Sequence, residues 1–198
     1  MRKLKLNMQM TLDGFVARPN GELDWMTLDL DDKLRADFNS NTASFDTILM
    51  GRKMTTEFMD YWTKEVKNPQ SPEYPLAKMM VEYPKIVFTK TLDKTPSWWP
   101  NTTLAKGDLV DEVNRIKNQG GKDIVVYGGA TFVSSLIKNN LIDEYYFFVN
   151  PVAIGDGMTI FRDLGRRFDL KQLDATPYEC GVTVHRYLPA KARAATSA

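Results

Sequence analysis

The chain has 198 residues, of which 43% are hydrophobic, so it is long and apolar enough to fold as one globular domain. Its 26 lysine and arginine residues nearly balance 25 aspartate and glutamate residues, and the net charge of +1 gives no reason to expect nucleic acid or a membrane as a partner. A single cysteine, Cys180, excludes an intramolecular disulfide framework, and the lack of a signal peptide or a run of about 20 apolar residues predicts a cytoplasmic location.

Apolar residues recur with strand or helix spacing along almost the whole chain. In chain order, the spacing predicts a strand at 4–10, a helix at 32–42, a strand at 46–51, a helix around 55–61, strands at 85–89 and 102–105, a helix at 108–118, a strand at 123–127, a helix after 130, and strands at 141–149, 168–173 and 182–188. Four prolines among charged residues over 64–84 predict a loop with a short helix near 76–81.

This alternation of strands and helices predicts one α/β domain over residues 1–188. We expect a mostly parallel sheet with flanking helices, and antiparallel strands at its C-terminal end. The small, polar and basic residues 189–198 are expected to form a frayed tail.

Two segments share one pattern, a short apolar strand that ends in glycine and leads into a helix. The first is 46–51, which ends at Gly51, and the second is 123–129, which ends at Gly128-Gly129. Glycine lets a ligand approach the main chain closely, and the start of a helix offers unpaired N–H groups to a phosphate. Each turn alone is equally well a simple strand-to-helix connection, and the spacing G-x-G-x-x-G is missing. Together they predict a site for a phosphorylated ligand.

With these units placed, the chain resembles the dihydrofolate reductase-like fold, a three-layer α/β architecture. It is most similar to the reductase domain of the bacterial riboflavin-biosynthesis protein and its stand-alone relatives. The matching pieces, in order, are 10–17, 48–55, 86–90, 123–131 and 147–161. They extend over about residues 3 to 188, and their order is more specific than any one of them.

The resemblance implies that NADPH binds across the carboxyl ends of the strands. It implies phosphate contacts from both glycine units, contacts to the adenosine 2′-phosphate after the 85–89 strand, and a cover for the nicotinamide. The implied cofactor residues are Phe15, Val16, Gly51, Arg52, Lys53, Thr55, Thr89, Lys90, Tyr127, Gly128, Gly129, Ala130 and Thr131. Arg52 at a helix start agrees with a polyanion bound there, although a solvated surface arginine is the simpler alternative.

The chain departs from dihydrofolate reductases in its first helix, where they carry a carboxylate that orients the pterin. Asp29, Asp31, Asp32 and Asp37 lie in this region, but none matches that motif, so reduction of dihydrofolate itself is not expected. Riboflavin-pathway enzymes often carry a zinc deaminase domain, and one cysteine and one histidine cannot build its metal site. We expect no metal.

Asp13, in Leu12-Asp13-Gly14, is the candidate catalytic residue. It either closes a turn or faces the substrate, where it orients a polar ring or relays a proton. Asn7, Met10, Trp25 and Trp62 are the candidate substrate-binding residues, and the 64–84 loop is expected to border the same space.

We therefore expect an NADPH-dependent reductase that transfers hydride to a small heterocyclic or ribitylamino-type substrate. The alternative, from another class, is a module that binds NADPH without turnover, which gains support if the substrate space is closed. A homodimer is expected from the family and from the aromatic run at 145–148. The sequence does not identify the substrate.

Overall fold

The structure is a computed structural model that describes residues 1–27, 29–162 and 164–190. Its strands are β1 (Leu4–Thr11), β2 (Phe45–Gly51), β3 (Lys85–Phe88), β4 (Thr102–Ala105), β5 (Asp123–Val126), β6 (Glu144–Asn150), β7 (Leu170–Pro177) and β8 (Thr183–Pro189). Its helices are α1 (Asp32–Thr42), α2 (Arg52–Glu65), α3 (Tyr74–Glu82), α4 (Leu109–Lys117) and α5 (Ala130–Lys138). The elements alternate as the sequence predicts.

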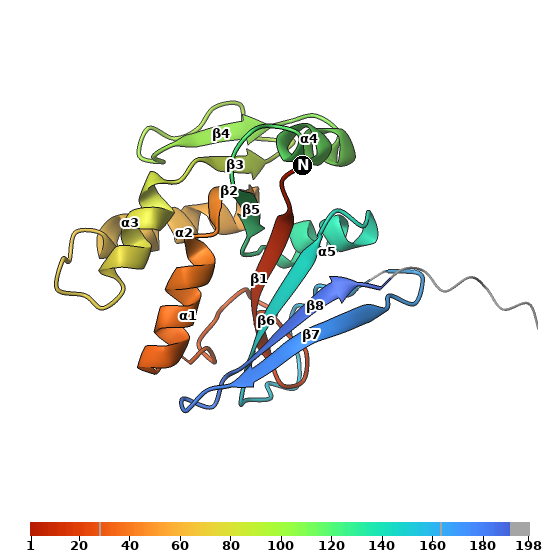
Figure 1. Cartoon of the computed structure of the whole chain (residues 1–198). Coiled ribbons are helices and arrows are strands. Elements are labelled where there is room, and N and C mark those ends of the chain that lie inside the picture. Colours follow the sequence, from red (N-terminus) through yellow and green to blue (C-terminus); the bar gives the residue numbers. More distant parts are fainter. Residues whose placement is uncertain (28, 163, 191–198) are drawn as a thin grey trace, which may run out of the picture.

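The strands form one eight-stranded sheet in the order β4-β3-β2-β5-β1-β6-β8-β7 (Figure 1). The first six strands of this order are parallel to one another. Strand β8 runs antiparallel to β6, and β7 runs antiparallel to β8. The expected mostly parallel sheet with antiparallel C-terminal strands is therefore confirmed.

The helices cover the sheet from two sides, because the chain reverses its direction of travel across the sheet. It runs outward from β1 through β2 and β3 to β4, and then returns to β5 and β6. Right-handed crossovers place connections of opposite direction on opposite faces. On one face, side chains of α2 and α3 pack into one cluster and those of α1 into a second cluster. On the opposite face, side chains of α4 and α5 pack into a third cluster.

Strand β1 shows how alternation distributes side chains between the two faces. Leu4, Leu6, Met8 and Met10 are buried in the cluster that α4 and α5 cover. Their neighbours point the other way, toward α1, as shown by the hydrogen bond from Lys5 Nζ to Ser44 Oγ at 3.1 Å. A period of two thus divides β1 between an apolar face and a polar face.

The structure differs from the sequence prediction mainly in element boundaries. Helix α2 begins directly at Arg52 and continues to Glu65, so it takes in the start of the segment predicted as a loop. Strand β7 lies two to four residues later than predicted, because Phe168 turns inward against Tyr145, with ring centroids 5.9 Å apart. Pro189 still belongs to β8, and the rest of the predicted tail after Ala190 lies outside the described residues. Among the described residues, no helix combines the length and the hydropathy needed to cross a bilayer.

Candidate functional site

The site lies at the edge of the sheet where the five central parallel strands end. The turns after β1, β2, β3, β5 and β6 all leave from this edge, and most of the predicted site residues belong to them. Strands β2 and β5 are neighbours, yet α2 follows β2 on one face and α5 follows β5 on the other. The carboxyl ends of strands at such a switch point are where α/β sheets commonly bind ligands.

The helices α2 and α5 begin at this switch point without a side-chain cap. Gly51 and Gly129 are their N-cap residues, and neither can offer a side chain to the first N–H groups. By contrast, Asp31 caps α1 and accepts from Leu34 N, and Asp108 caps α4. Two free helix starts at adjacent strand ends form a potential anion site. Ala130 and Thr131 form the first turn of α5.

One glycine in each turn allows close packing between the two units. A Cβ atom on Gly51 would lie 2.7 Å from Phe132 Cβ in α5, and one on Gly128 would lie 2.8 Å from Met54 Sδ in α2. A side chain of each helix thus packs against the glycine of the other unit. The cross-packing holds the two helix starts together, and the sequence contains no local signal for it.

Basic side chains next to these turns are exposed. Arg52 and Lys53 occupy the first turn of α2, and within the described residues neither forms an ion pair. Thr55 differs from them, because it is buried and its hydroxyl donates to Gly51 O at 3.1 Å. Arg52 and Lys53 are thus free to reach an anion, while Thr55 serves the helix itself.

The turn after β3 is organised by its own side chains. The Thr89 hydroxyl accepts from Thr91 N and Leu92 N, and Lys90 Nζ donates to two carbonyls, those of Lys106 and Gly107. A shallow hollow of about 510 Å³ lies along residues 92–97, directly beyond this turn. Lys90 would have to leave its carbonyl partners to meet a phosphate.

Asp13 joins the loop after β1 to the loop after β6. Its carboxylate accepts from the Thr11 hydroxyl at 2.6 Å, from Gly155 N at 2.8 Å and from Ile154 N at 3.0 Å. The Thr11 hydroxyl, followed by the Gly155 amide, lowers the pKa of Asp13, so the group is ionised near neutral pH. The carboxylate accepts hydrogen bonds that link the two loops, and it is a poor proton donor.

Phe15 and Val16 belong to the same loop, which is fixed by main-chain hydrogen bonds. Thr11 N donates to Phe15 O at 2.8 Å, and Val16 N donates to Met158 O at 2.8 Å. The loop is therefore held beside the strand ends of β1 and β6, where the resemblance places a nicotinamide cover.

The four predicted substrate residues do not gather at one point. Asn7 is buried on the face of β1 that points toward α1, whereas Met10 packs on the opposite face. Trp62 lies in α2 against the ring of Tyr61, 4.8 Å away between centroids, and Trp25 is buried in the loop after β1. Tyr127 also points inward, and burial raises the pKa of its hydroxyl.

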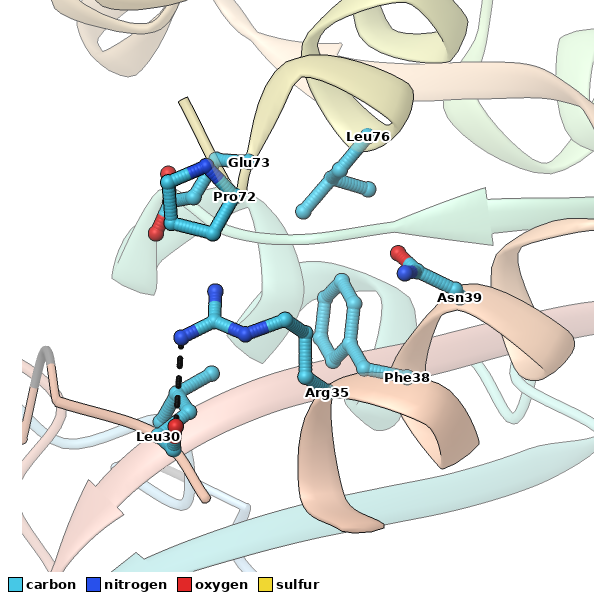
Figure 2. A pocket seen from close by; sticks show the side chains of 7 residues that line it. All are labelled: Leu30, Arg35, Phe38, Asn39, Pro72, Glu73 and Leu76. Atoms are coloured by element: carbon cyan, nitrogen blue, oxygen red, sulfur yellow. Dashed lines mark hydrogen bonds between the residues drawn. The ribbon is translucent and has the colours of Figure 1, made fainter. Parts of the chain in front are cut away.

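A small pocket opens between α1 and the start of α3 (Figure 2). Its volume is about 20 Å³, close to that of one water molecule, and much less than a small-molecule site needs. It is lined by Leu30, Arg35, Phe38, Asn39, Pro72, Glu73 and Leu76. Neither Arg35 nor Asn39 was among the site residues predicted from the sequence, although each lies one turn of α1 away from another polar residue.

The carboxylates near α1 have structural roles. Asp31 caps the helix and also accepts from Cys180 N at 3.1 Å, and Asp37 accepts from the Tyr178 hydroxyl at 2.8 Å. The described residues contain no group of three or more histidine, cysteine, aspartate or glutamate side chains that could hold a metal ion.

Comparisons with known proteins agree with this architecture. The model of the RibD C-terminal domain matches residues 2–184. The uncharacterised protein YyaP of Bacillus subtilis is 32% identical over 183 residues, which cover 91% of this chain and 92% of YyaP.

Solved structures show the same fold. A putative riboflavin biosynthesis protein from Shewanella superposes with a TM-score of 0.74 at 21% identity, covering 96% of this chain and all of that one. Dihydrofolate reductase from Enterococcus faecalis, complexed with NADP(H), gives a TM-score of 0.58 at 14% identity and covers 96% and 97% of the two chains. The chain therefore belongs to the RibD C-terminal domain family and has a dihydrofolate reductase-like fold, which supports a reductase-like function.

Proposed function

We propose that this protein is an NADPH-dependent reductase that transfers hydride to a small heterocyclic or ribitylamino-type substrate. One observation carries the proposal: α2 and α5 begin without side-chain caps at the ends of the adjacent strands β2 and β5. Their free N–H groups and dipoles favour a pyrophosphate, and no side chain of the two N-cap residues competes for them.

The residues around this point fit a dinucleotide that carries a further phosphate. Gly129 leaves the main chain open, since a Cβ atom there would meet only Met54 Cβ at 3.8 Å, whereas Gly128 is covered by Met54. Arg52 and Lys53 are exposed cations that form no ion pair within the described residues. The hollow along residues 92–97 provides room beyond the β3 turn for the adenosine end. The Enterococcus faecalis relative in fold binds NADP(H), which agrees with this choice of cofactor.

The bound cofactor would supply the hydride, and the protein would supply position and exclusion of water. Positioning alone can account for about 7–11 kcal/mol of a barrier, so no strongly perturbed acid is needed. Asp13 is suited to orienting the substrate or the loop around it, because its carboxylate is ionised and already accepts three hydrogen bonds. The proton that completes the reduction would then come from water or from the substrate side.

Calorimetric titration of the purified protein with NADPH and, separately, with NADH tests the cofactor. We expect micromolar or tighter binding of NADPH and weaker binding of NADH. Binding of neither nucleotide would contradict the proposal. Equal affinities would remove the role of the 2′-phosphate and leave the pyrophosphate site.

A second candidate is a module that binds NADPH without turnover. It is favoured by the scatter of the predicted substrate residues, since Asn7 and Met10 lie on opposite faces of β1 and Trp62 packs against Tyr61 in α2. Oxidation of NADPH in the presence of pterins, pyrimidines or small carbonyl compounds would exclude this alternative. NADPH binding without oxidation by any of them would support it.

We also propose that the protein forms a homodimer. The family resemblance supports this proposal, whereas the aromatic residues of β6 do not, because Tyr145, Tyr146, Phe147 and Phe148 are buried within the protomer's own core. Light scattering coupled to size-exclusion chromatography would show twice the chain mass of 22.6 kDa, and a monomer at micromolar concentration would contradict it.

A further inference from the structure

The Asp13 carboxylate lies between two loops at the carboxyl edge of the sheet, and it makes contacts in two directions. One oxygen, Oδ1, accepts from the Thr11 hydroxyl at 2.6 Å within its own loop. The other, Oδ2, accepts from the amides of Ile154 and Gly155 in the loop after β6, at 3.0 and 2.8 Å. Three donors already occupy the two oxygens, so this carboxylate is better suited to holding the protein than to holding a substrate.

The first direction leads to Phe15 through the hydroxyl of Thr11. The lowered pKa of Asp13 keeps the carboxylate ionised, so it can only accept. The single hydroxyl proton of Thr11 therefore points to Asp13, 2.6 Å away, rather than to Phe15 O at 3.3 Å. The Thr11 oxygen is then free to accept from Phe15 N at 2.9 Å, and Thr11 is buried, which keeps water from taking its place. Asp13 thus orients the hydroxyl that holds the Phe15 main chain.

The second direction leads to the same residue through the segment 154–157. A Cβ atom on Gly157 would lie 3.1 Å from both Cβ and Cγ of Phe15, and it would overlap the carbonyl oxygen of Ala17. The main chain at Gly157 therefore lies directly against the Phe15 side chain. The hydrogen bonds to Asp13 fix this segment two and three residues earlier. Both directions from the carboxylate converge on Phe15.

Main-chain hydrogen bonds join the two loops only on either side of the carboxylate. Leu12 N donates to Val152 O, and Val16 N donates to Met158 O, each at 2.8 Å. Between these anchors, the hydrogen bonds that the amides of 153–157 donate within the described residues all go to the carboxylate. Its loss should therefore loosen the middle of this double loop while the ends stay attached.

The sheet order indicates which end of a dinucleotide would meet this double loop. Strand β5 lies between β2 and β1, and β3 lies beyond β2. With the pyrophosphate at the starts of α2 and α5, and the adenosine end in the hollow beyond β3, the other end of the cofactor extends toward β1 and β6. The half-buried side chain of Phe15 follows β1 at this edge. Phe15 thus lies on the side of the site where the nicotinamide is expected.

We propose that Asp13 is a positioning residue that holds Phe15 against the nicotinamide end of the bound cofactor and does not itself contact the substrate. This inference rests on the proposed function, and it decides between the two roles considered for Asp13, orienting the substrate or orienting the loop. The carboxylate acts through Thr11 and through the segment 154–157, and Phe15 is the group that meets the ligand. Loss of the carboxylate should therefore reduce only the part of the affinity that comes from the nicotinamide.

Two ligands separate the ends of the cofactor in a calorimetric titration. NADPH carries the nicotinamide ring, whereas 2′-phospho-ADP-ribose has the same adenosine, 2′-phosphate and pyrophosphate without the ring. Asp13→Asn keeps the size and the turn preference of the side chain, but three donors then compete for one acceptor oxygen. Asp156→Asn is the matched control, because Asp156 is an exposed carboxylate of the same double loop that takes no part in these contacts.

We expect Asp13→Asn to weaken NADPH about tenfold and to leave 2′-phospho-ADP-ribose within about twofold of wild type. Phe15→Ala should give the same split, and the double variant should lose no more than Phe15→Ala alone, because the two residues act as one unit. Thr11→Val should resemble Asp13→Asn and replaces it if that variant does not fold. Thr11→Ser, which keeps the hydroxyl, should restore most of the affinity lost in Thr11→Val. Asp156→Asn should change neither affinity.

Hydrogen exchange of the ligand-free protein adds a measurement that does not depend on the cofactor. The Phe15 amide should exchange faster in Asp13→Asn than in wild type or Asp156→Asn, although its direct partner is Thr11. Unchanged exchange at Phe15, equal weakening of both ligands, or additive losses in the double variant would overturn the inference. Binding of both ligands to wild type without the split would remove only the role of Asp13, whereas binding of neither would overturn the cofactor proposal itself.

Discussion

The two edges of the central sheet use charged residues in opposite ways. At the amino ends of the strands, basic side chains are paired: Arg2 with Asp46, and Lys5 with Asp123 at 2.9 Å. At the carboxyl ends, Arg52 and Lys53 are exposed and form no ion pair within the described residues. Charges at the first edge hold strands together. At the second edge Arg52 and Lys53 are free for a ligand, whereas Lys90 is held by two carbonyls and Lys106 pairs with Asp93.

Burial explains the difference. The amino-edge cations Arg2, Lys5 and Lys117 are almost completely buried, so each needs a partner to offset the loss of hydration. Lys117, for example, contacts Asp143 at 2.5 Å and Leu141 O at 3.2 Å. The carboxyl-edge cations remain in water, and an unpaired charge there carries little penalty. A substitution should therefore affect stability at one edge and ligand affinity at the other.

The sharpest test exchanges one arginine at each edge for methionine. Arg2→Met should lower the free energy of unfolding by about 2–4 kcal/mol, because the Asp46 carboxylate, the Thr47 hydroxyl and Lys122 O lose their guanidinium donor. Asp46 keeps the Lys122 amide and the Thr47 hydroxyl as donors, and part of its carboxylate stays hydrated. Denaturant unfolding measures this loss.

The matched variant, Arg52→Met, should leave unfolding within about 0.5 kcal/mol of wild type, as for other exposed positions. It should weaken NADPH about 10- to 100-fold and NADH much less, as expected for a lost charge-assisted contact to phosphate. Calorimetry measures both nucleotides. An equal loss for the two would contradict the expectation that Arg52 contributes to the choice of NADPH over NADH, and a large loss of stability would contradict the contrast between the two edges.

The glycine turns are an exception to the contrast between the edges, because substitutions there should lower stability although they lie at the carboxyl edge. Gly51→Ala should destabilise the protein by about 1–3 kcal/mol, since the new methyl meets Phe132 Cβ, which cannot move without α5. Gly128→Ala should have a smaller effect, because the contact atom is the flexible Met54 sulfur. Thermal unfolding of the two variants compares them, and the reverse ranking would show that α5 yields more easily than Met54.

The smallest expected effect concerns Lys85, which is fully buried at the start of β3. Its ammonium group donates to three carbonyls at the end of α3, those of Met80, Val81 and Tyr83. Lys85→Met should lower the free energy of unfolding by about 1–2 kcal/mol, because these carbonyls lose their donor.

The same variant predicts a pH dependence. Burial lowers the pKa of Lys85 from 10.5 to about 8, so between these values the unfolded chain binds a proton that the folded chain has released. The contribution of Lys85 to the free energy of unfolding should therefore rise as the pH increases from about 8 to 10.5, and fall as the pH decreases over the same range. Denaturant unfolding of wild type and variant across this range gives the difference, and a flat difference would mean that the carbonyls keep the ammonium charged.

Much of the fold could be predicted because local patterns carry it. The apolar strand at 46–51, the Asp108 cap and the apolar stripe of 108–118 each depend on neighbours within a few residues. The order of several such pieces identified the family. The place of β7 was missed because Phe168 owes its position to packing against Tyr145. The end of α2 was missed because the prolines and charges after Lys64 indicated a loop.

The candidate site was predicted unevenly for the same reason. Residues in the turns, such as Arg52 and Gly129, lie at the sheet edge where the pattern placed them. Arg35 and Asn39 were not predicted, because the local sequence does not show whether a polar residue on a helix lines a pocket or faces solvent. The sequence also could not show that Asp13 is already engaged by Ile154 and Gly155, 141 and 142 residues away.

By itself, the sequence determined the alternating elements, the family and the two glycine turns, because these depend on periodicity and on residues close in the chain. Only the tertiary structure decided which groups have partners. It paired the amino-edge cations, engaged Asp13 and left the Asn7 amide without a hydrogen-bond partner among the described residues. The partners are distant in the chain, 44 residues for Arg2 and Asp46 and 142 for Asp13 and Gly155, so they become visible only when those segments meet.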